Sequence, residues 1–332
     1  MIRVRTGSRL HFGLMALPSE VSNWPNTGGQ VAVPRRRFGG VGMMIDHPGI
    51  ELTVEHASQW SAQGPLSERA IQFAQKYCAN ASVSSCFCIK IHHAAPEHAG
   101  LGTGTQLALA VARGIAKLAR VDSYEESSAT LLAKRVGRGL RSSIGTHGFA
   151  FGGLMVDGGK IKDDEISPNV ASACVPEDWN VLLVLPQGLQ GAHGKLEINA
   201  FAEIAGRPPD DAATDALCRI VLLGLLPAIY QNDFESFSES VYDYNRRAGE
   251  MFRSAQRGVY ANERIEHIVN AIRGFGVKAV GQSSWGPAVF AITLQENVQR
   301  LQRHLELSGA VRPEEMVVTQ PRNQGAVLST EY

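Results

Sequence analysis

Apolar and polar residues alternate in several stretches of the first half of the chain, a pattern typical of half-buried β-strands. It covers residues 2–17, ELTVEH at 51–56 and CFCIKIHH at 86–93. In SERAIQFAQKYCANA, residues 67–81, apolar residues recur at helical spacing, and Ser67 is a candidate N-cap. The first half is therefore predicted to mix strands and helices.

Glycines interrupt this pattern repeatedly. RRRFGGVGMMIDHPG, residues 35–49, predicts short strand-like runs separated by glycines. A glycine-rich turn opens a long Ala- and Leu-rich helix within residues 97–121, and residues 124–139 predict a further helix that ends at Gly137 or Gly139. HGFAFGGLMVDGGKI, residues 147–161, predicts a β-hairpin.

The polar, proline-containing segment 162–178 predicts a domain boundary, with one domain over residues 1–168 and a second over 169–332. The second domain is predicted to contain both kinds of element. Strands are expected within 179–186, on both sides of a turn in 277–292 and within 314–321, and helices within 211–231, 234–252, 263–276 and 295–309.

Composition narrows the class of protein. Apolar residues (44%) and charged residues (19%) are those of an ordinary folded chain. Lys plus Arg equals Asp plus Glu, at 32 each, so there is no overall positive field to hold a nucleic acid. No stretch approaches the roughly 18 uninterrupted apolar residues of a membrane helix, and the N-terminus lacks the apolar core of a signal peptide. We expect a cytoplasmic protein without a nucleic-acid or membrane partner.

The cysteines suggest reduced, packed thiols. Cys86 and Cys88 form a CxC pair with His92 and His93 nearby, but a zinc site usually takes two CxxC pairs or histidines at set spacing. A metal knuckle here remains the alternative. The cysteines are Cys78, Cys86, Cys88, Cys174 and Cys218.

Two glycine-rich turns are candidate anion sites. In PEHAGLGTGTQLALA, from Pro96, glycines precede a helix whose first N–H groups would be unpaired, and the helix dipole favours an anion there. No Lys-Ser or Lys-Thr follows, so this is not a Walker loop. A tight strand-to-helix turn is an equally good interpretation. The second turn is GQSSWGPAVF, from Gly281.

Charged candidates lie elsewhere. Arg138 and Arg141 stand in GRGLRSSIGTHGFAFGG, where arginines suit bidentate anion contacts, or are solvated at a helix end. Arg9 and His11 are two apart, hence on one strand face, although a lone histidine is more often a core residue. Asp46 could bind a metal, contact a ribose hydroxyl or start a turn. His147 and Glu97 are weaker candidates.

The first glycine-rich turn resembles the phosphate-binding motif of the GHMP superfamily, which includes galactokinase, homoserine kinase and mevalonate kinase. Thr103 and Gly104 stand at the positions of its Ser-Ser pair. GQSSWGPAVFAI resembles the C-terminal glycine-rich motif, with Trp285 at a usually small position. GHMP kinases commonly carry a catalytic aspartate shortly before a Gly-Gly pair, but no acidic residue lies between Ser142 and Gly153, which argues against phosphoryl transfer.

RLHFGL, GLGTGTQ, GRGLRSSIG and GQSSWGP together resemble one branch, the β-ribofuranosylaminobenzene 5′-phosphate synthases. The resemblance implies a two-domain α+β fold of the GHMP kinase type, with the active site in the cleft between the domains. It implies the joining of 5-phosphoribosyl 1-pyrophosphate to 4-aminobenzoate or 4-hydroxybenzoate, with release of pyrophosphate and CO2, in methanopterin biosynthesis. It also implies Mg²⁺, no organic cofactor and a homodimer. The alternatives are an ATP-dependent small-molecule kinase and a non-catalytic ligand-binding protein.

The resemblance also suggests roles for the candidates. Arg9, His11 and Arg141 are the expected catalytic residues, with His11 as proton donor. Arg9, Arg138 and Arg141 would neutralise phosphate or the benzoate carboxylate, and Asp46 would help to place Mg²⁺. Trp285 would stack on the aromatic acceptor or fill the domain interface. Phosphate or pyrophosphate would be bound by Gly100, Gly102, Thr103, Gly104, Thr105, Gly281, Ser283, Ser284 and Gly286. Four residues also resemble the family without an assigned role: Glu197, Phe201, Gln256 and Tyr260.

Overall fold

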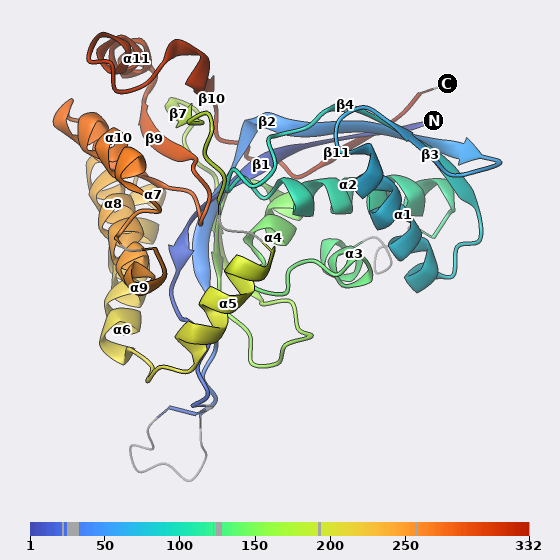
Figure 1. The fold of residues 1–332 in the computed structure, drawn as a ribbon, viewed down its shortest axis with the longest axis horizontal. Coiled ribbons are helices and arrows are strands. Elements are labelled where there is room, and N and C mark those ends of the chain that lie inside the picture. The colour runs from blue at the N-terminus through green and yellow to red at the C-terminus, as the bar shows by residue number, and fades with distance from the viewer. Residues whose placement is uncertain are drawn as a thin grey trace.

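The computed structural model describes residues 1–21, 23–24, 33–121, 123, 128–191, 194–256 and 258–331, with side chains undescribed at 194–197 and 254–255. Two β-sheets, each covered by helices, meet in the middle of the molecule (Figure 1). The α+β class predicted from the sequence is therefore confirmed.

The larger sheet has seven strands in the described chain, and its centre is formed by two long neighbours, β1 (Ile2–Leu14) and β2 (Gly40–Ala57). The pairings are antiparallel except for the parallel pair β3–β4. The strand order is β11-β1-β2-β4-β3, and β5 and β6 continue from the other end of β2. These strands are β3 (Ser61–Gln63), β4 (Cys86–His93), β5 (Leu154–Asp157), β6 (Asn169–Ala173) and β11 (Val327–Thr330).

Four helices accompany this sheet: α1 (Ser67–Ala81), α2 (Thr103–Leu118), α3 (Ala129–Val136) and α4 (Ile144–Phe151). The central helix α2 packs on β1 and β2, with a nearly continuous run of buried apolar residues from Leu107 to Ala116. It comes close to the sheet at Gly114, where an added Cβ would lie 2.7 Å from Val54 Cγ2. The N-terminus of α2 is thereby fixed against the middle of the sheet.

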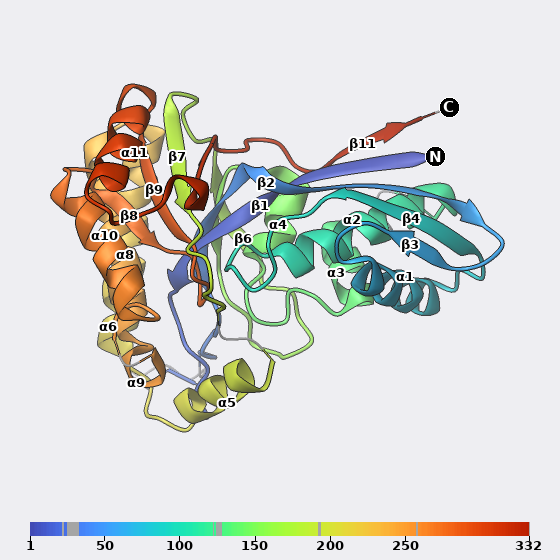
Figure 2. The ribbon, with the colours of Figure 1, turned by 45° about the horizontal axis from the view of Figure 1, so that its top comes forward.

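The smaller sheet has the order β10-β7-β9-β8. Figure 2 shows it beside a stack of helices at the opposite end of the molecule from α1. Its strands are β7 (Trp179–Val184), β8 (Ala279–Gln282), β9 (Val289–Leu294) and β10 (Met316–Thr319). The helices of this half are α5 (Gly194–Ala205), α6 (Asp211–Ile220), a π-helical turn (Val221–Leu225), α7 (Leu226–Tyr230), α8 (Phe234–Glu250), α9 (Arg253–Gln256), α10 (Glu263–Gly274) and α11 (Val298–Leu307).

Helix α8 joins the two halves. The side-chain amide of Asn245 donates to Phe12 O at 2.7 Å and to Gln282 O at 2.9 Å, so that it connects β1 with β8. The Tyr244 hydroxyl donates to Gly13 O at 3.0 Å. A single apolar core runs through this junction. The end of β1 is consequently held in place from both halves.

Several predictions need correction. Strands β6 and β11 lie beyond residue 168 but pair with the larger sheet, so the boundary at 168/169 does not separate the two sheets. The hairpin predicted at 147–161, with its turn at Gly158 and Gly159, is wrong: residues 147–151 belong to α4, and the strand that precedes the turn, β5, pairs with β6. The residue before α1 is Leu66, and Ser67 makes no cap. Residues 40–57 form one continuous strand rather than short runs.

The remaining predicted elements are confirmed at α1, α2, β4, β7, α8, α10, α11 and β10, and in the strand–turn–strand of β8 and β9. The described cysteines are all free. One helical stretch, Asp211–Tyr230, is long and apolar enough by composition to cross a membrane. Its residues Leu217, Val221 and Leu225 pack into the central core, whereas Leu222 and Leu223 are exposed.

Candidate active site

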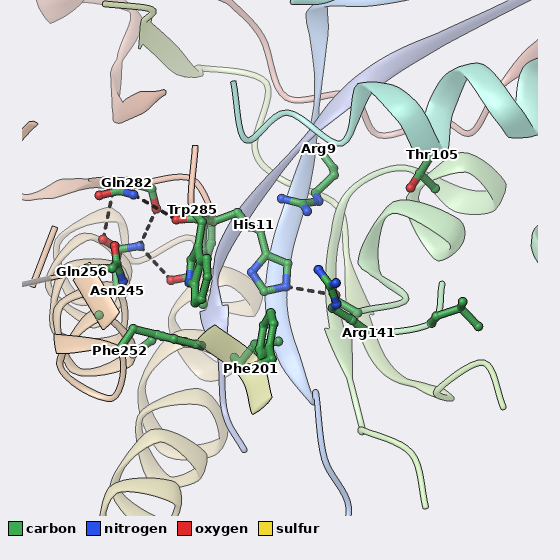
Figure 3. A pocket seen from close by; sticks show the side chains of 18 of the residues that line it. Arg9, His11, Thr105, Arg141, Phe201, Asn245, Phe252, Gln256, Gln282 and Trp285 are labelled. Atoms are coloured by element: carbon green, nitrogen blue, oxygen red, sulfur yellow. Dashed lines mark hydrogen bonds between the residues drawn. The ribbon is translucent and has the colours of Figure 1, made fainter. Parts of the chain in front are cut away.

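A cavity of about 440 Å³ lies where the two halves meet. One side is formed by β1 and by the loop that follows α3, and it carries Arg9, His11, Arg138 and Arg141. The opposite side comes from α5, α8, α9 with the residues on either side of it, and β8 with the turn that follows. That side is aromatic and amide-rich, with Phe201, Asn245, Phe252, Gln256, Tyr260, Gln282 and Trp285 (Figure 3). The cavity thus has a cationic wall facing a neutral, partly aromatic wall.

The two glycine-rich motifs contact each other directly behind this cavity. A Cβ on Gly100, whose φ is +88°, would lie 2.2 Å from Ser283 O. A Cβ on Gly286 would lie 2.1 Å from both Ala99 C and Gly100 N. Ser283 Oγ donates to Gly100 O at 2.8 Å and accepts from His11 N at 3.0 Å. The glycines therefore allow three segments, far apart in sequence, to meet at the end of β1.

The predicted phosphate-binding residues divide into two groups. Thr105, Arg138, Ser284 and Trp285 line the cavity. The others do not line it. A Cβ on Gly281 would collide with the Asn245 amide, and Gly102 faces the Arg9 side chain. Gly104 lies close to two arginines, and Thr103 Oγ1 donates to Pro96 O at 2.8 Å. For Gly100, Gly102, Thr103, Gly104, Gly281, Ser283 and Gly286, phosphate binding stays a prediction, and the structure gives each a packing or hydrogen-bond contact.

The cationic wall is partly desolvated. Burial, with the nearby charge of Arg69, lowers the pKa of Arg138 to about 10. Burial also lowers the pKa of Arg69, whose guanidinium forms an ion pair with Glu97. A Cβ on Gly104 would lie 2.7 Å from Arg69 Nη2 and 3.0 Å from Arg138 Nη2, so both arginines reach the first turn of α2. Close like charges beside a helix N-terminus favour a bound anion.

His11 is a neutral group in this setting. Its side chain is 3% exposed, and burial, together with the charge of Arg9, lowers its pKa well below 6.5. Nε2 lies 2.9 Å from Ser142 Oγ. An imidazole that is uncharged at neutral pH can accept a proton or share a hydrogen bond, but does not hold the proton of a standing acid. The role of His11 as proton donor stays a prediction.

Two buried ionisable side chains, Asp157 and Lys160, form hydrogen bonds with the backbone of the loop that carries Arg141 and Ser142. Neither was among the predicted site residues. Asp157 accepts from Ser143 N at 2.6 Å and from Gly159 N at 2.9 Å, and its side chain is fully buried. Lys160 Nζ donates to Leu140 O and, at 2.9 Å, to Asp163 O. Both residues follow the Gly-Gly pair in sequence. Their role depends on a chain reversal that no local pattern reveals.

Trp285 lies at the seam between the halves, half-buried in an aromatic group. Its indole stacks on Phe201 with ring centroids 5.1 Å apart and planes within 2°, and it meets Phe252 edge-on at 5.0 Å. Gln256 and Tyr260 line the cavity as Phe201 does. Three of the four residues that had no assigned role therefore lie at the site. The side chain of Glu197 is outside the described residues.

The predicted metal residue is elsewhere. Asp46 does not line the cavity, and its carboxylate accepts from Arg322 Nη1 at 2.9 Å. Among the described residues that line the cavity, none carries a carboxylate, and the described chain contains no group of three or more His, Cys, Asp or Glu side chains suited to a metal ion. The weaker candidates also have other partners: Glu97 pairs with Arg69, and His147 Nε2 lies 2.7 Å from Ser167 O.

Comparison with known proteins defines the class. Residues 66–153 match the GHMP kinases N terminal domain, and residues 225–310 match the GHMP kinases C terminal domain. Homoserine kinase from Cytophaga hutchinsonii has the same fold, with a TM-score of 0.67 at 14% identity over 99% of this chain and 97% of that one. Mevalonate diphosphate decarboxylase from Enterococcus faecalis gives 0.66 at 14% identity over 99% of each chain. The fold is that of the GHMP superfamily.

Closer relatives identify the branch. The chain is 30% identical to the beta-ribofuranosylphenol 5'-phosphate synthase of Methanothermobacter thermautotrophicus over 98% of each chain. It is 30% identical to the protein of that name from Archaeoglobus fulgidus over 99% of each, and 27% identical to that of Methanocaldococcus jannaschii over 87% of this chain and 88% of that one. The chain belongs to the beta-ribofuranosylphenol 5'-phosphate synthase family, which confirms the resemblance seen in its motifs and makes it a relative of synthases.

Proposed function

We propose that this protein joins 5-phosphoribosyl 1-pyrophosphate to a 4-substituted benzoate, with release of pyrophosphate and CO2. One observation carries the proposal: a cavity with three arginines and a neutral histidine on one wall, aromatic rings on the other, and no carboxylate among its described lining residues. The donor carries several negative charges and the acceptor a planar ring with one more. The cationic and aromatic walls match these two kinds of group.

The reaction requires no nucleophile from the protein. The bond between ribosyl C1 and the pyrophosphate oxygen breaks, and its electron pair leaves with pyrophosphate. The ring carbon that bears the carboxylate forms a bond to C1, and loss of CO2 returns an electron pair to the ring. No net proton transfer is needed, which agrees with a histidine held neutral. Arg9, Arg138 and Arg141 would stabilise the leaving charge, and a closed cavity would orient the reactants.

A hydroxyl-phosphorylating kinase is the competing function, because the fold is shared with homoserine kinase. Transfer of a phosphoryl group to a hydroxyl usually uses a carboxylate that orients the acceptor. The first acidic residue after the Arg141 loop in sequence, Asp157, is fully buried and accepts hydrogen bonds from the backbone N–H groups of Ser143 and Gly159. It is not a lining residue of the cavity, so the described residues supply no such carboxylate.

The relatives' name suggests which acceptor to test first. Decarboxylative ribosylation of 4-hydroxybenzoate would give a ribofuranosylphenol phosphate, the product in the name of the three relatives. The same reaction of 4-aminobenzoate would give the aminobenzene product. Mg²⁺ is proposed to accompany the pyrophosphate group, since the described lining residues offer no carboxylate to hold it, and no step is assigned to the ion.

Turnover with two donors separates the candidate functions. The protein, Mg²⁺ and 4-hydroxybenzoate are incubated with either 5-phosphoribosyl 1-pyrophosphate or ATP, and pyrophosphate and ADP are measured. Pyrophosphate release that depends on both the ribosyl donor and the benzoate supports the synthase. ADP formation from ATP when homoserine or another small alcohol replaces the benzoate, without any ribosyl transfer, would establish the kinase. Binding of the donor without turnover would favour the non-catalytic alternative.

A further inference from the structure

The Phe201 side chain lies in a slot with two different faces. On one side the Trp285 indole is parallel to it, with ring centroids 5.1 Å apart and an interplanar angle of 2°. On the other side Arg141 Cζ lies 4.9 Å from the ring centroid. Phe38 and Phe252 meet its edges at 5.7 and 5.9 Å. Figure 3 shows the Phe201 ring in the cavity below His11, between Trp285 and Arg141.

These surroundings suit a charged aromatic ligand better than a phenylalanine. An aromatic face on one side and a guanidinium on the other would hold any six-membered ring by stacking and cation–π contacts. A ring that carries an anionic group such as a carboxylate would also match the cationic character of the wall, because Arg9 and Arg141 line the same cavity. The benzyl ring of Phe201 has the size of a benzoate ring but carries no charge.

We propose that the slot between Trp285 and Arg141 is the binding site for the aromatic carboxylate, and that Phe201 is its internal occupant. The identity of the ligand as the acceptor rests on the proposed function. Phe201 would leave the slot together with α5 when the benzoate enters. The ring of the ligand would then take over the contacts that Phe201 makes with Trp285, Phe38 and Phe252.

The placement of α5 allows such a displacement. The helix crosses in front of the junction between the halves, outside the two helix-covered sheets (Figures 1 and 2). Phe201 and Ile204 connect it to a small apolar cluster with Leu14, Phe38 and Phe252. This cluster is separate from the large cores of the two halves. Withdrawal of α5 would therefore disturb neither core.

An internal occupant lowers the apparent affinity, because the ligand binds only the fraction of molecules in which the slot is open. Removing the Phe201 ring leaves the slot permanently open. If the slot is open in about one molecule in ten, removal tightens binding about tenfold. Without an occupant role, the same change removes a stacking surface and weakens binding.

The test is calorimetric titration of the full chain with 4-hydroxybenzoate and, as a ligand control, with 4-hydroxybenzyl alcohol, which lacks the carboxylate. The variants are Phe201→Ala, Phe201→Leu as a replacement that keeps the apolar cluster filled, and Phe151→Ala as a matched control on an exposed phenylalanine. We expect about tenfold tighter benzoate binding for Phe201→Ala, a smaller gain for Phe201→Leu, an unchanged Phe151 variant and no gain for the alcohol.

Equal or weaker benzoate binding by both Phe201 variants would overturn the occupant role, as would the absence of benzoate binding from every protein. Because the readout is binding, its failure is distinguishable from failure of the proposed reaction. If the Phe201 variants bind benzoate more tightly but the protein releases no CO2, the slot proposal stands and the proposed synthase function does not.

Discussion

Replacement of Gly286 by alanine separates two roles for the C-terminal glycine motif. The sequence suggests phosphate binding, whereas the structure places Gly286 against the backbone of the other glycine motif. The added Cβ would lie 2.1 Å from Ala99 C, 2.1 Å from Gly100 N and 2.2 Å from Ala99 O. Gly286 is not among the glycines with positive φ, so the expected effect is steric and not conformational.

The magnitude follows from what would have to move. Overpacking a core usually costs about 1–3 kcal/mol, because flexible side chains absorb part of the strain. Here all three colliding atoms belong to the backbone, and the same segment is tied by the bond from Ala288 N to Ala99 O at 3.1 Å. We therefore expect Gly286→Ala to lower the free energy of unfolding by about 3 kcal/mol, the upper end of that range.

Urea denaturation followed by circular dichroism measures this loss, with Gly274→Ala as the matched control. Gly274 ends α10 and has no neighbour within 4 Å of an added Cβ. Alanine there should leave stability unchanged or raise it by up to about 1 kcal/mol, because it is the better helix former. The reasoning is refuted if Gly286→Ala unfolds at the wild-type urea concentration and loses only its affinity for pyrophosphate.

Three further predictions concern the cationic wall and the loop that carries Arg141. Arg141→Ala should lower kcat/KM roughly tenfold or more, since each ~1.4 kcal/mol of lost transition-state stabilisation is a factor of ten, and unchanged kinetics would exclude a role in the reaction. Asp157→Asn should lower the free energy of unfolding by about 2 kcal/mol, because the two carboxylate oxygens accept from two backbone N–H groups and asparagine has only one acceptor oxygen. It should also raise KM for the ribosyl donor, and an unchanged KM would show that the contacts of Asp157 do not affect the site. His11 is neutral in the folded state, so below pH 6.5 the unfolded state takes up a proton that the folded state does not, and stability falls by up to about 1.4 kcal/mol per pH unit. His11→Gln should reduce that slope in denaturation curves measured between pH 7 and pH 5, and an identical slope would contradict a depressed pKa.

The elements that the sequence predicts correctly are those with a clear period. α2 follows a glycine-rich turn with a long apolar run, and β4 alternates cleanly over Cys86–His93. Residues 147–151 were mistaken for a strand because a short apolar run with glycines fits either a strand or a buried helix turn. The local pattern could not show that β6, which lies within the polar segment 162–178, pairs with β5.

In the site, too, residues with a local pattern are predicted and those positioned by distant contacts are not. Arg9 and His11 both line the cavity, as their spacing on one strand predicts. Asp157 accepts a hydrogen bond from Ser143 N in the Arg141 loop, a contact that forms only when the chain folds back on itself. The placement of Phe201 between Trp285 and Arg141 likewise joins three distant segments of the chain. Residues whose chemistry is supplied by distant partners carry no local signal.

The central claim is tested most directly by the stoichiometry of the two leaving groups. The protein is incubated with Mg²⁺, 5-phosphoribosyl 1-pyrophosphate and carboxyl-labelled 4-hydroxybenzoate, with 4-aminobenzoate in parallel, and labelled CO2 and pyrophosphate are counted together. The account predicts equal amounts of both, formed only when donor and acceptor are present. Pyrophosphate release without labelled CO2, or ribosylation with the carboxylate retained, would contradict it.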